Sequence, residues 1–148
     1  MIKCDFCSPK VIANQVILKT RKLLVILTKT PIVPGHLLIL PLRHIGKIDG
    51  LTPLERSAIF KIIPKLRQVL EKTFGAKGFN FAWNEGKEAG QSIGHLHFHM
   101  VPRKAGDLGI TKYEPRKFLY RPGSREQSSK AKLKNIAGIL KSELKNIK

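Results

Sequence analysis

The chain has 148 residues, with 28 Lys or Arg against 10 Asp or Glu, so its formal net charge at pH 7 is +18. This length suits one domain with its own hydrophobic core, and we expect residues 1–148 to form a single domain. The apolar runs are far shorter than the roughly 20 residues that span a bilayer, and the N-terminus lacks a signal-peptide pattern. We therefore expect a cytoplasmic protein without a membrane segment. The charge favours anionic partners such as nucleotides or nucleic acids, but it equally suits a solvated, Lys-rich surface.

Both cysteines, Cys4 and Cys7, lie in the N-terminal segment 1–10 with two residues between them. This spacing suits a tetrahedral zinc knuckle, provided that two further ligands complete the site. A redox pair is the alternative, although that motif is typical of a βαβ pattern, which the extreme N-terminus does not offer.

The next segments predict strands and one long helix. Residues 15–20 and 22–28 are β-rich runs broken by Arg21 and Lys22, which predicts a hairpin, and residues 36–41 are apolar on both faces, as in a central strand. Thr52, Pro53 and Glu55 predict a helix start with a capping box, and helical spacing continues to residues 74–75. Pro64 should kink this helix because it removes one backbone hydrogen bond.

Residues 78–84 predict a fourth strand, and residues 125–148 return to helical spacing with many lysines. This C-terminal helix could meet nucleic acid or a membrane surface, but we expect it to pack its apolar stripe on the core. The expected fold is α+β, with an antiparallel sheet of about five strands, one long helix and a C-terminal helix.

Three histidines, His95, His97 and His99, alternate with apolar residues at positions 96, 98 and 100. Such alternation predicts a half-buried strand that carries three imidazoles on one face. The row could bind a metal, or one imidazole could be a nucleophile. Residues 90–94, Gly-Gln-Ser-Ile-Gly, precede the row and offer groups that suit phosphate oxygens, which favours chemistry at phosphorus.

Gly-Gln-Ser-Ile followed by His-x-His-x-His-x-x-Pro-Arg resembles the histidine triad (HIT) superfamily. Asn84-Glu85-Gly86 and Pro34-Gly35-His36 resemble its other motifs, and residues 102–107 resemble its fragile-histidine-triad (Fhit) branch. The resemblance covers about residues 4–110. It implies a HIT-like fold, a homodimer and a nucleotide substrate.

The resemblance also implies roles for individual residues. His97 would attack the α-phosphorus and form a nucleotidyl-histidine intermediate, His99 would bind a phosphate oxygen, and His36 would lie behind the nucleophile. Gln91 and Ser92 would touch the phosphate or the leaving-group oxygen, although ordinary loop hydrogen bonding is an alternative for Ser92 and Asn84. The implied substrate-binding residues are Asn84, Ser92, Thr28, Ile26, Leu38, Phe6 and Val11.

The resemblance also bears on how the ribose of the substrate and a zinc ion would be bound. Thr28 stands where the family usually has Asp or Asn for the ribose hydroxyls, and a single hydroxyl is a weaker partner for a diol. Many bacterial and archaeal HIT proteins complete a zinc site from C-x-x-C and two histidines, which here would be His44 and His95. The Fhit branch lacks this knuckle. With Cys4 and Cys7 the set has four ligands, so a zinc ion there would be structural.

Three classes of function stay open. The first is hydrolysis of dinucleoside polyphosphates, such as diadenosine triphosphate or tetraphosphate, to release AMP, with cleavage of phosphoramidates as in the Hint branch as its variant. The second is removal of adenylate from nucleic-acid ends, as in aprataxin-like members. The third is nucleotide binding with little turnover. The sequence leaves open transfer instead of hydrolysis, and magnesium entering with the substrate.

Overall fold

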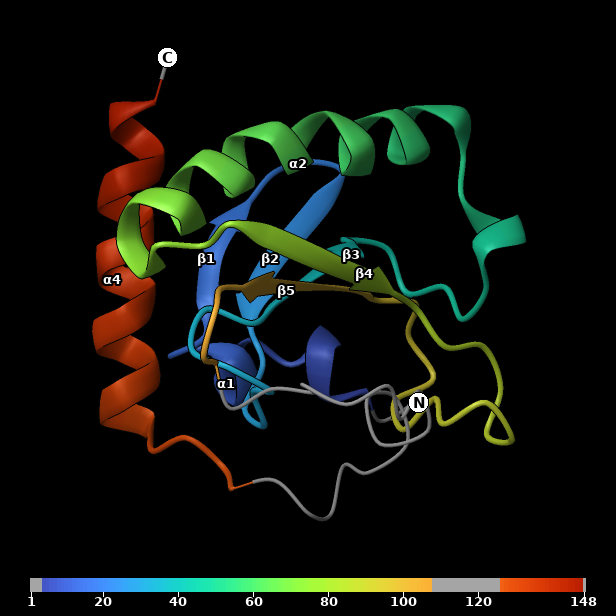
Figure 1. The fold of residues 1–148 in the computed structure, drawn as a ribbon. Coiled ribbons are helices and arrows are strands. Elements are labelled where there is room, and N and C mark those ends of the chain that lie inside the picture. Colours follow the sequence, from blue (N-terminus) through green and yellow to red (C-terminus); the bar gives the residue numbers. More distant parts are fainter. Residues whose placement is uncertain (1–3, 108–125, 148) are drawn as a thin grey trace.

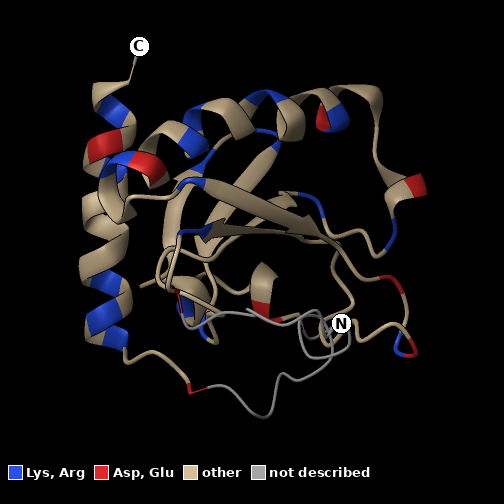
Figure 2. Ribbon diagram, viewed as in Figure 1, with Lys and Arg blue, Asp and Glu red and all other residues tan. Residues whose placement is uncertain are grey.

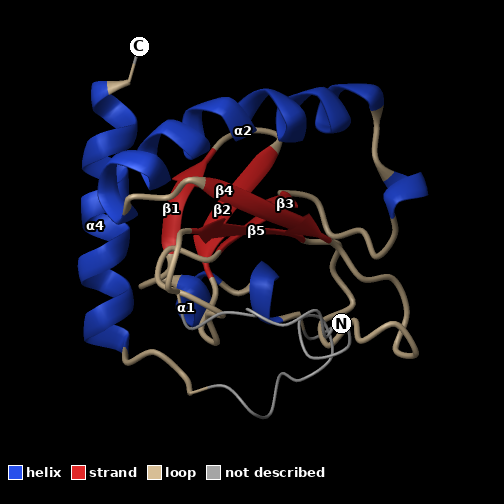
Figure 3. Cartoon of the chain, viewed as in Figure 1, coloured by secondary structure: helices blue, strands red, loops and turns tan. Residues whose placement is uncertain are grey.

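The apolar runs of the N-terminal half form the first three strands of a five-stranded antiparallel sheet (Figures 1 and 3). A computed structural model describes residues 4–107 and 126–147. The sheet order is β1-β2-β3-β5-β4. The strands are β1 (Val16–Lys19), β2 (Leu23–Leu27), β3 (Leu37–Pro41), β4 (Gly78–Ala82) and β5 (Phe98–Arg103). The predicted α+β class is confirmed.

The two central strands β2 and β3 are buried along their whole length, as the continuous apolar runs predict. Side chains on one face, such as Val25 and Ile39, join the main core with the helices. Side chains on the other face, such as Ile26 and Leu38, form a smaller cluster with Phe6. The N-terminal segment, which contains the short helix α1 (Pro9–Ile12), covers this second face.

The long helix α2 (Pro53–Phe74) begins and ends where the sequence predicts. The Thr52 hydroxyl accepts a hydrogen bond from the Glu55 backbone N–H at 3.2 Å, and the Glu55 carboxylate accepts one from the Thr52 N–H at 2.8 Å. This reciprocal pair is the predicted capping box. The helix ends at Gly75, whose φ of 67° is the left-handed conformation that glycine adopts without strain.

The triad strand is shorter than the alternation predicts. Strand β5 begins at Phe98, so His95 and His97 precede it and His99 alone lies on it. The ladder to β3 stops at the Ile39–Phe98 pair. Two residues further on, Pro41 has no N–H to donate, and its carbonyl accepts a hydrogen bond from the His95 ring instead. The alternation still holds, because Leu96 and Met100 are fully buried in the main core.

The C-terminal helix α4 (Lys130–Asn146) packs against α2 and the sheet through Leu133, Ala137, Leu140 and Leu144. Packing was the expected role, and the lysines at positions described for this helix are exposed. Figure 2 shows where Lys and Arg lie along its ribbon. Residues 125 and 148 of the expected helix, and residues 1–3 of the expected knuckle segment, lie outside the described residues. Within 4–107 and 126–147, no helix combines the length and the apolar character needed to cross a membrane.

Candidate active site and metal centre

His97 is buried just before β5 and is held by its own segment. Its Nδ1 lies 2.7 Å from the His95 carbonyl oxygen. Because a carbonyl only accepts, Nδ1 carries the proton and Nε2 keeps the lone pair. Burial lowers the pKa of His97, against a smaller opposing effect of the hydrogen bond to His95. The ring is therefore a neutral imidazole whose Nε2 is unprotonated.

His99 and His36 form a second pair, with His99 Nδ1 2.9 Å from His36 Nε2. The backbone N–H of Ile32 donates to His36 Nδ1 at 3.1 Å, so His36 carries its proton on Nε2 and donates it to His99. Because His99 Nδ1 accepts this bond, the hydrogen-bond network assigns the proton of His99 to Nε2. The network thus gives His97 an acceptor nitrogen and His99 a donor, which are the two opposite properties that attack on a phosphate requires.

An open cavity of about 130 Å³ lies beside His97 and His99. Six of the predicted substrate-binding residues line it, namely Phe6, Val11, Thr28, Leu38, Asn84 and Ser92. Ile26 is not among the lining residues, because it is fully buried in the apolar cluster that also contains Leu38. Sequence reasoning missed Ile12, Gln15 and Thr30, which also line the cavity.

Two loop residues make hydrogen bonds to the backbone. The Gln91 amide accepts from the Gly86 N–H at 2.8 Å and donates to the Gly46 carbonyl at 3.0 Å, and Gln91 is not among the lining residues. Asn84 lines the cavity and also donates to the Gly90 carbonyl at 3.4 Å. Both side chains thus fix the loop that leads into the triad.

The four residues predicted to hold zinc come together. The ligand atoms of Cys4, Cys7, His44 and His95 all lie within 4.8 Å of one another. His95 Nδ1 is 3.6 Å from Cys4 Sγ and 3.5 Å from Cys7 Sγ, and His44 Nδ1 is 3.4 Å from Cys7 Sγ. A sulfur and a nitrogen bound to one tetrahedral zinc ion lie roughly 3.5 Å apart. The group therefore fits a zinc ion in size, ligand type and number.

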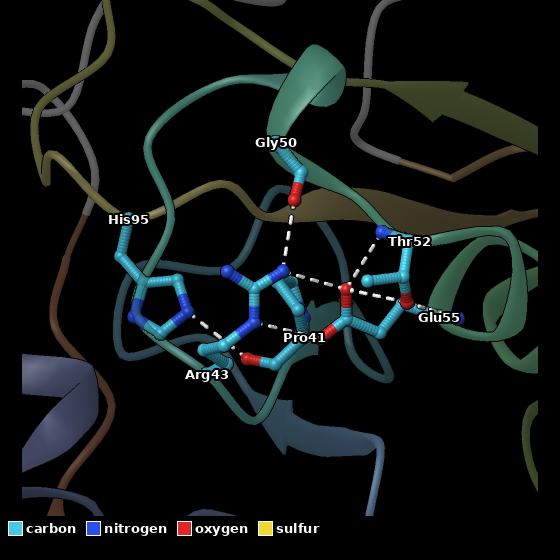
Figure 4. Close-up of polar contacts among 6 residues, drawn as sticks. All are labelled: Pro41, Arg43, Gly50, Thr52, Glu55 and His95. Carbon is cyan, nitrogen blue, oxygen red and sulfur yellow. Dashed lines mark hydrogen bonds and ion pairs between the residues drawn. The ribbon is translucent and has the colours of Figure 1, made fainter.

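The surroundings of His95 orient it as a ligand. Its Nε2 donates to the Pro41 carbonyl at 3.0 Å, which leaves the Nδ1 lone pair for the metal (Figure 4). Burial lowers the pKa of His95, which favours the neutral ring that a metal needs. Two residues beyond Pro41, Arg43 pairs with Glu55 of α2, so the segment that carries His44 is tied to the helix (Figure 4).

The chain is similar in sequence to known proteins. Bis(5'-nucleosyl)-tetraphosphatase (asymmetrical) of Schizosaccharomyces pombe is 36% identical over 97 residues, which are 66% of this chain and 53% of that protein. Bis(5'-adenosyl)-triphosphatase of Dictyostelium discoideum is 36% identical over 78 residues, 53% of this chain and 52% of that protein. The chain thus matches about half the length of each relative.

The fold is shared with solved structures. A Zn-bound histidine triad family protein from Mycobacterium smegmatis superposes with a TM-score of 0.74 at 22% identity, over 99% of this chain and 96% of that one. The family model described as the HIT domain matches residues 9–106, from helix α1 through the triad. This match covers most of the sequence, and the resemblance read from the motifs is confirmed: the chain belongs to the HIT domain family.

Proposed function

We propose that the protein hydrolyses dinucleoside polyphosphates at an α-phosphate and releases AMP, with His97 as the nucleophile. The observation that carries this proposal is the hydrogen bond from His97 Nδ1 to the His95 carbonyl, which leaves Nε2 unprotonated in a ring that lines the cavity. The names of the two relatives, a tetraphosphatase and a triphosphatase, support the substrate class.

The reaction has two displacements at the same phosphorus. In the first, His97 Nε2 forms a bond to the α-phosphorus while the bond to the bridging oxygen breaks, and the leaving nucleotide takes the electron pair. In the second, water attacks the phosphorus and releases a proton to the solvent, the phosphorus–nitrogen bond breaks, and His97 recovers its lone pair as AMP forms. The His95 carbonyl stabilises the positive charge that His97 carries between the two steps.

The other cavity residues bind the substrate in this proposal. The proton that His99 carries on Nε2 stabilises the nonbridging oxygens, with His36 fixing that tautomer and Ser92 donating beside it. Phe6, Val11 and Leu38 receive the base, with Ile26 behind them, while Thr28 receives the ribose and Asn84 the phosphate side. Gln91 acts as a positioning residue that holds the loop before the triad.

We further propose that Cys4, Cys7, His44 and His95 hold a structural zinc ion, as their spacing supports. Four protein ligands leave no open position, so the ion braces the segment beside the nucleophile. The thiols must stay reduced to bind a metal, which suits the cytoplasm. Magnesium carried by the polyphosphate is part of the substrate chemistry, and assays with and without it define its contribution.

A homodimer completes the proposal. Among the residues that the structure describes, strand β4 is an edge of the sheet, and the aromatic side chains of Phe81 and Trp83 on and just after it are 46% and 47% exposed. Large apolar groups on an open edge favour pairing with a second copy, which would extend the sheet across a two-fold axis.

The deciding experiment compares AMP release from diadenosine triphosphate and from adenosine phosphoramidate for wild type and His97→Ala. We expect wild type to cleave the first substrate preferentially. His97→Ala should lower kcat by at least about 10⁴-fold, because no other group replaces the attacking nitrogen. AMP binding by the variant, measured by calorimetry, is the control for an intact cavity.

Each other outcome points to a different function. Preference for the phosphoramidate would move the substrate to the Hint type. Absence of release from both substrates, with nucleotide still bound, would contradict the hydrolase. In that case a steep salt dependence of binding to adenylated DNA would favour the nucleic-acid role.

A further inference from the structure

Gln15 occupies a fixed position in the wall of the cavity, between helix α1 and strand β1. It is 3% exposed and lines the same cavity as His97 and His99. Its backbone N–H donates to the Ile12 carbonyl at 2.8 Å, and its carbonyl accepts from the Leu27 N–H at 2.9 Å. These two bonds fix the backbone of Gln15 at the turn between α1 and β1.

The orientation of the Gln15 amide is determined by one strong hydrogen bond. Nε2 donates to the Leu27 carbonyl oxygen at 2.7 Å, and an amide turned the other way would bring two oxygens together. Oε1 therefore stays an acceptor. It is buried and has no hydrogen-bond partner among the described residues. Buried polar atoms are nearly always paired, so an acceptor left without a partner at a binding cavity indicates a group that arrives with the ligand.

Because Gln15 Oε1 is an acceptor, it can bind only those groups of a ligand that donate a hydrogen bond. Phosphate oxygens only accept hydrogen bonds at neutral pH, so Oε1 repels them. The donors of a nucleotide are the exocyclic amine of the base and the ribose hydroxyls. Apolar side chains from the same region, Val11 and Ile12 of α1, line the cavity as well and suit a nucleoside.

We propose that Gln15 is a specificity-determining residue whose Oε1 accepts a hydrogen bond from the nucleoside of the substrate. This inference rests on the proposed function, because it assumes that the cavity binds a nucleotide. Thr28 strengthens the need for such a group, since its hydroxyl already accepts the Thr30 N–H at 3.3 Å. The group that Oε1 recognises must be a hydrogen-bond donor. Two groups of adenosine can be this donor, namely the amine of the base and a ribose hydroxyl. A base with a carbonyl in place of the amine would meet an oxygen and be rejected.

The test measures the affinity of wild type for AMP, IMP, 2'-deoxy-AMP and 3'-deoxy-AMP by calorimetry. IMP replaces the amine by a carbonyl, and each deoxy analogue removes one hydroxyl. We expect wild type to bind AMP at least about tenfold more tightly than the analogue that lacks the recognised donor. Loss with IMP identifies the amine, and loss with a deoxy analogue identifies the hydroxyl.

Gln15→Met removes the acceptor and keeps the length of the side chain. In this variant the ratio between the affinity for AMP and that for the analogue lacking the donor should fall to about twofold or less. Without Oε1, neither nucleotide can form the hydrogen bond that distinguishes them in wild type. The matched control is Gln68→Leu on the exposed side of α2, which should keep the wild-type ratio. A ratio of two affinities in one variant is insensitive to a general loss of stability.

Three results overturn the inference. Equal wild-type affinities for all four nucleotides would mean that Oε1 meets water instead, and this result needs no variant. Discrimination that survives in Gln15→Met would assign it to another residue. A wild type that binds none of the four nucleotides also overturns the inference, and AMP release from diadenosine triphosphate then decides separately whether the proposed function fails with it.

Discussion

Arg43 and Glu55 form an ion pair next to His44, one of the proposed zinc ligands. Two guanidinium nitrogens lie 2.9 and 3.2 Å from the two carboxylate oxygens, and Arg43 also donates to the Gly50 carbonyl at 2.8 Å. Hydrogen bonds from Arg43 lower the pKa of Glu55 to about 2, although burial acts in the opposite direction. The pair therefore stabilises the folded state only while Glu55 is ionised.

This pairing predicts how stability depends on pH. A carboxyl whose folded pKa is depressed contributes stability that is present above its unfolded pKa of 4.5 and is lost as the pH falls through about 2. Glu55→Gln keeps the capping box but removes the charge. We expect the variant to be less stable than wild type at pH 7, and the difference in unfolding free energy to shrink between pH 5 and pH 2.

Urea unfolding at a series of pH values measures this difference. Glu71→Gln changes an exposed carboxylate on the same helix and serves as the matched control. If Glu55→Gln and wild type differ by a constant amount over the whole range, the Arg43 pair does not control the titration of Glu55.

Single residues differ in how well the sequence predicts their place. The group of possible zinc ligands was predictable, because the spacing of Cys4 and Cys7 suits a zinc knuckle and the resemblance supplied His44 and His95. Gln15 was not, since a lone Gln at the start of a strand is usually solvated, and its burial arises only when α1 folds over the sheet. The backbone contacts of Gln91 likewise depend on two loops distant in sequence.

The ends of a helix or strand could be predicted where they depend on neighbouring residues, but not where they depend on residues distant in sequence. The ends of α2 were predictable because a capping box and a C-terminal glycine act within a few residues. The start of β5 was not, because it depends on Pro41 in the neighbouring strand and on the ring of His95. Alternation alone reports which face a side chain takes and not where the ladder of hydrogen bonds stops.

Strand β4 is the element on which the proposed dimer depends. It pairs with β5 on one side, and its other side is an edge of the sheet within the described residues (Figure 1). Phe81→Asp should weaken self-association at least about tenfold, because a charge would replace a large exposed apolar side chain on the edge through which the proposed dimer pairs. Ile139→Asp, on an exposed position of α4, should leave it unchanged.

Sedimentation velocity over a range of protein concentrations measures the effect. Helix α4 packs against β1, the opposite edge of the sheet from β4, so the control tests a distant exposed apolar residue. A wild-type protein that stays monomeric at high concentration would contradict the dimer. Equal weakening by both substitutions would place the interface elsewhere.

At the scale of the whole molecule, the four possible zinc ligands, Cys4, Cys7, His44 and His95, bring together segments of the chain that are distant in sequence. Cys7 is 37 positions from His44 and 88 positions from His95, so one ion would close long loops of the chain. Such links remove conformational freedom mainly from the unfolded state. They also connect the N-terminal segment, which supplies Phe6 and Val11 to the cavity, to the residue whose carbonyl orients His97.

Removal of the metal should therefore lower the stability of the entire fold. Zinc bound by four protein ligands contributes several kcal/mol to folding, so a strong chelator should lower the Tm of the zinc-loaded protein on the order of 10 °C. The Tm of Cys7→Ser should be lower than that of wild type and should change little with the chelator. Added zinc should raise the Tm of chelator-treated wild type and should not raise that of the variant. The Tm is measured by calorimetry, with one zinc ion per chain verified by elemental analysis.

The same experiment distinguishes a structural role of the zinc ion from a direct role in the reaction. If the ion acts only by holding the segment at His95, metal-free protein kept below its lowered Tm should still bind AMP, with an affinity reduced because Phe6 and Val11 are less firmly placed. A zinc-loaded protein whose Tm is insensitive to the chelator, despite loss of the ion, would contradict the bracing role. The hydrogen bond from His97 to the His95 carbonyl would then have to be maintained by the sheet alone, through the packing of Leu96 and Met100 on its other face.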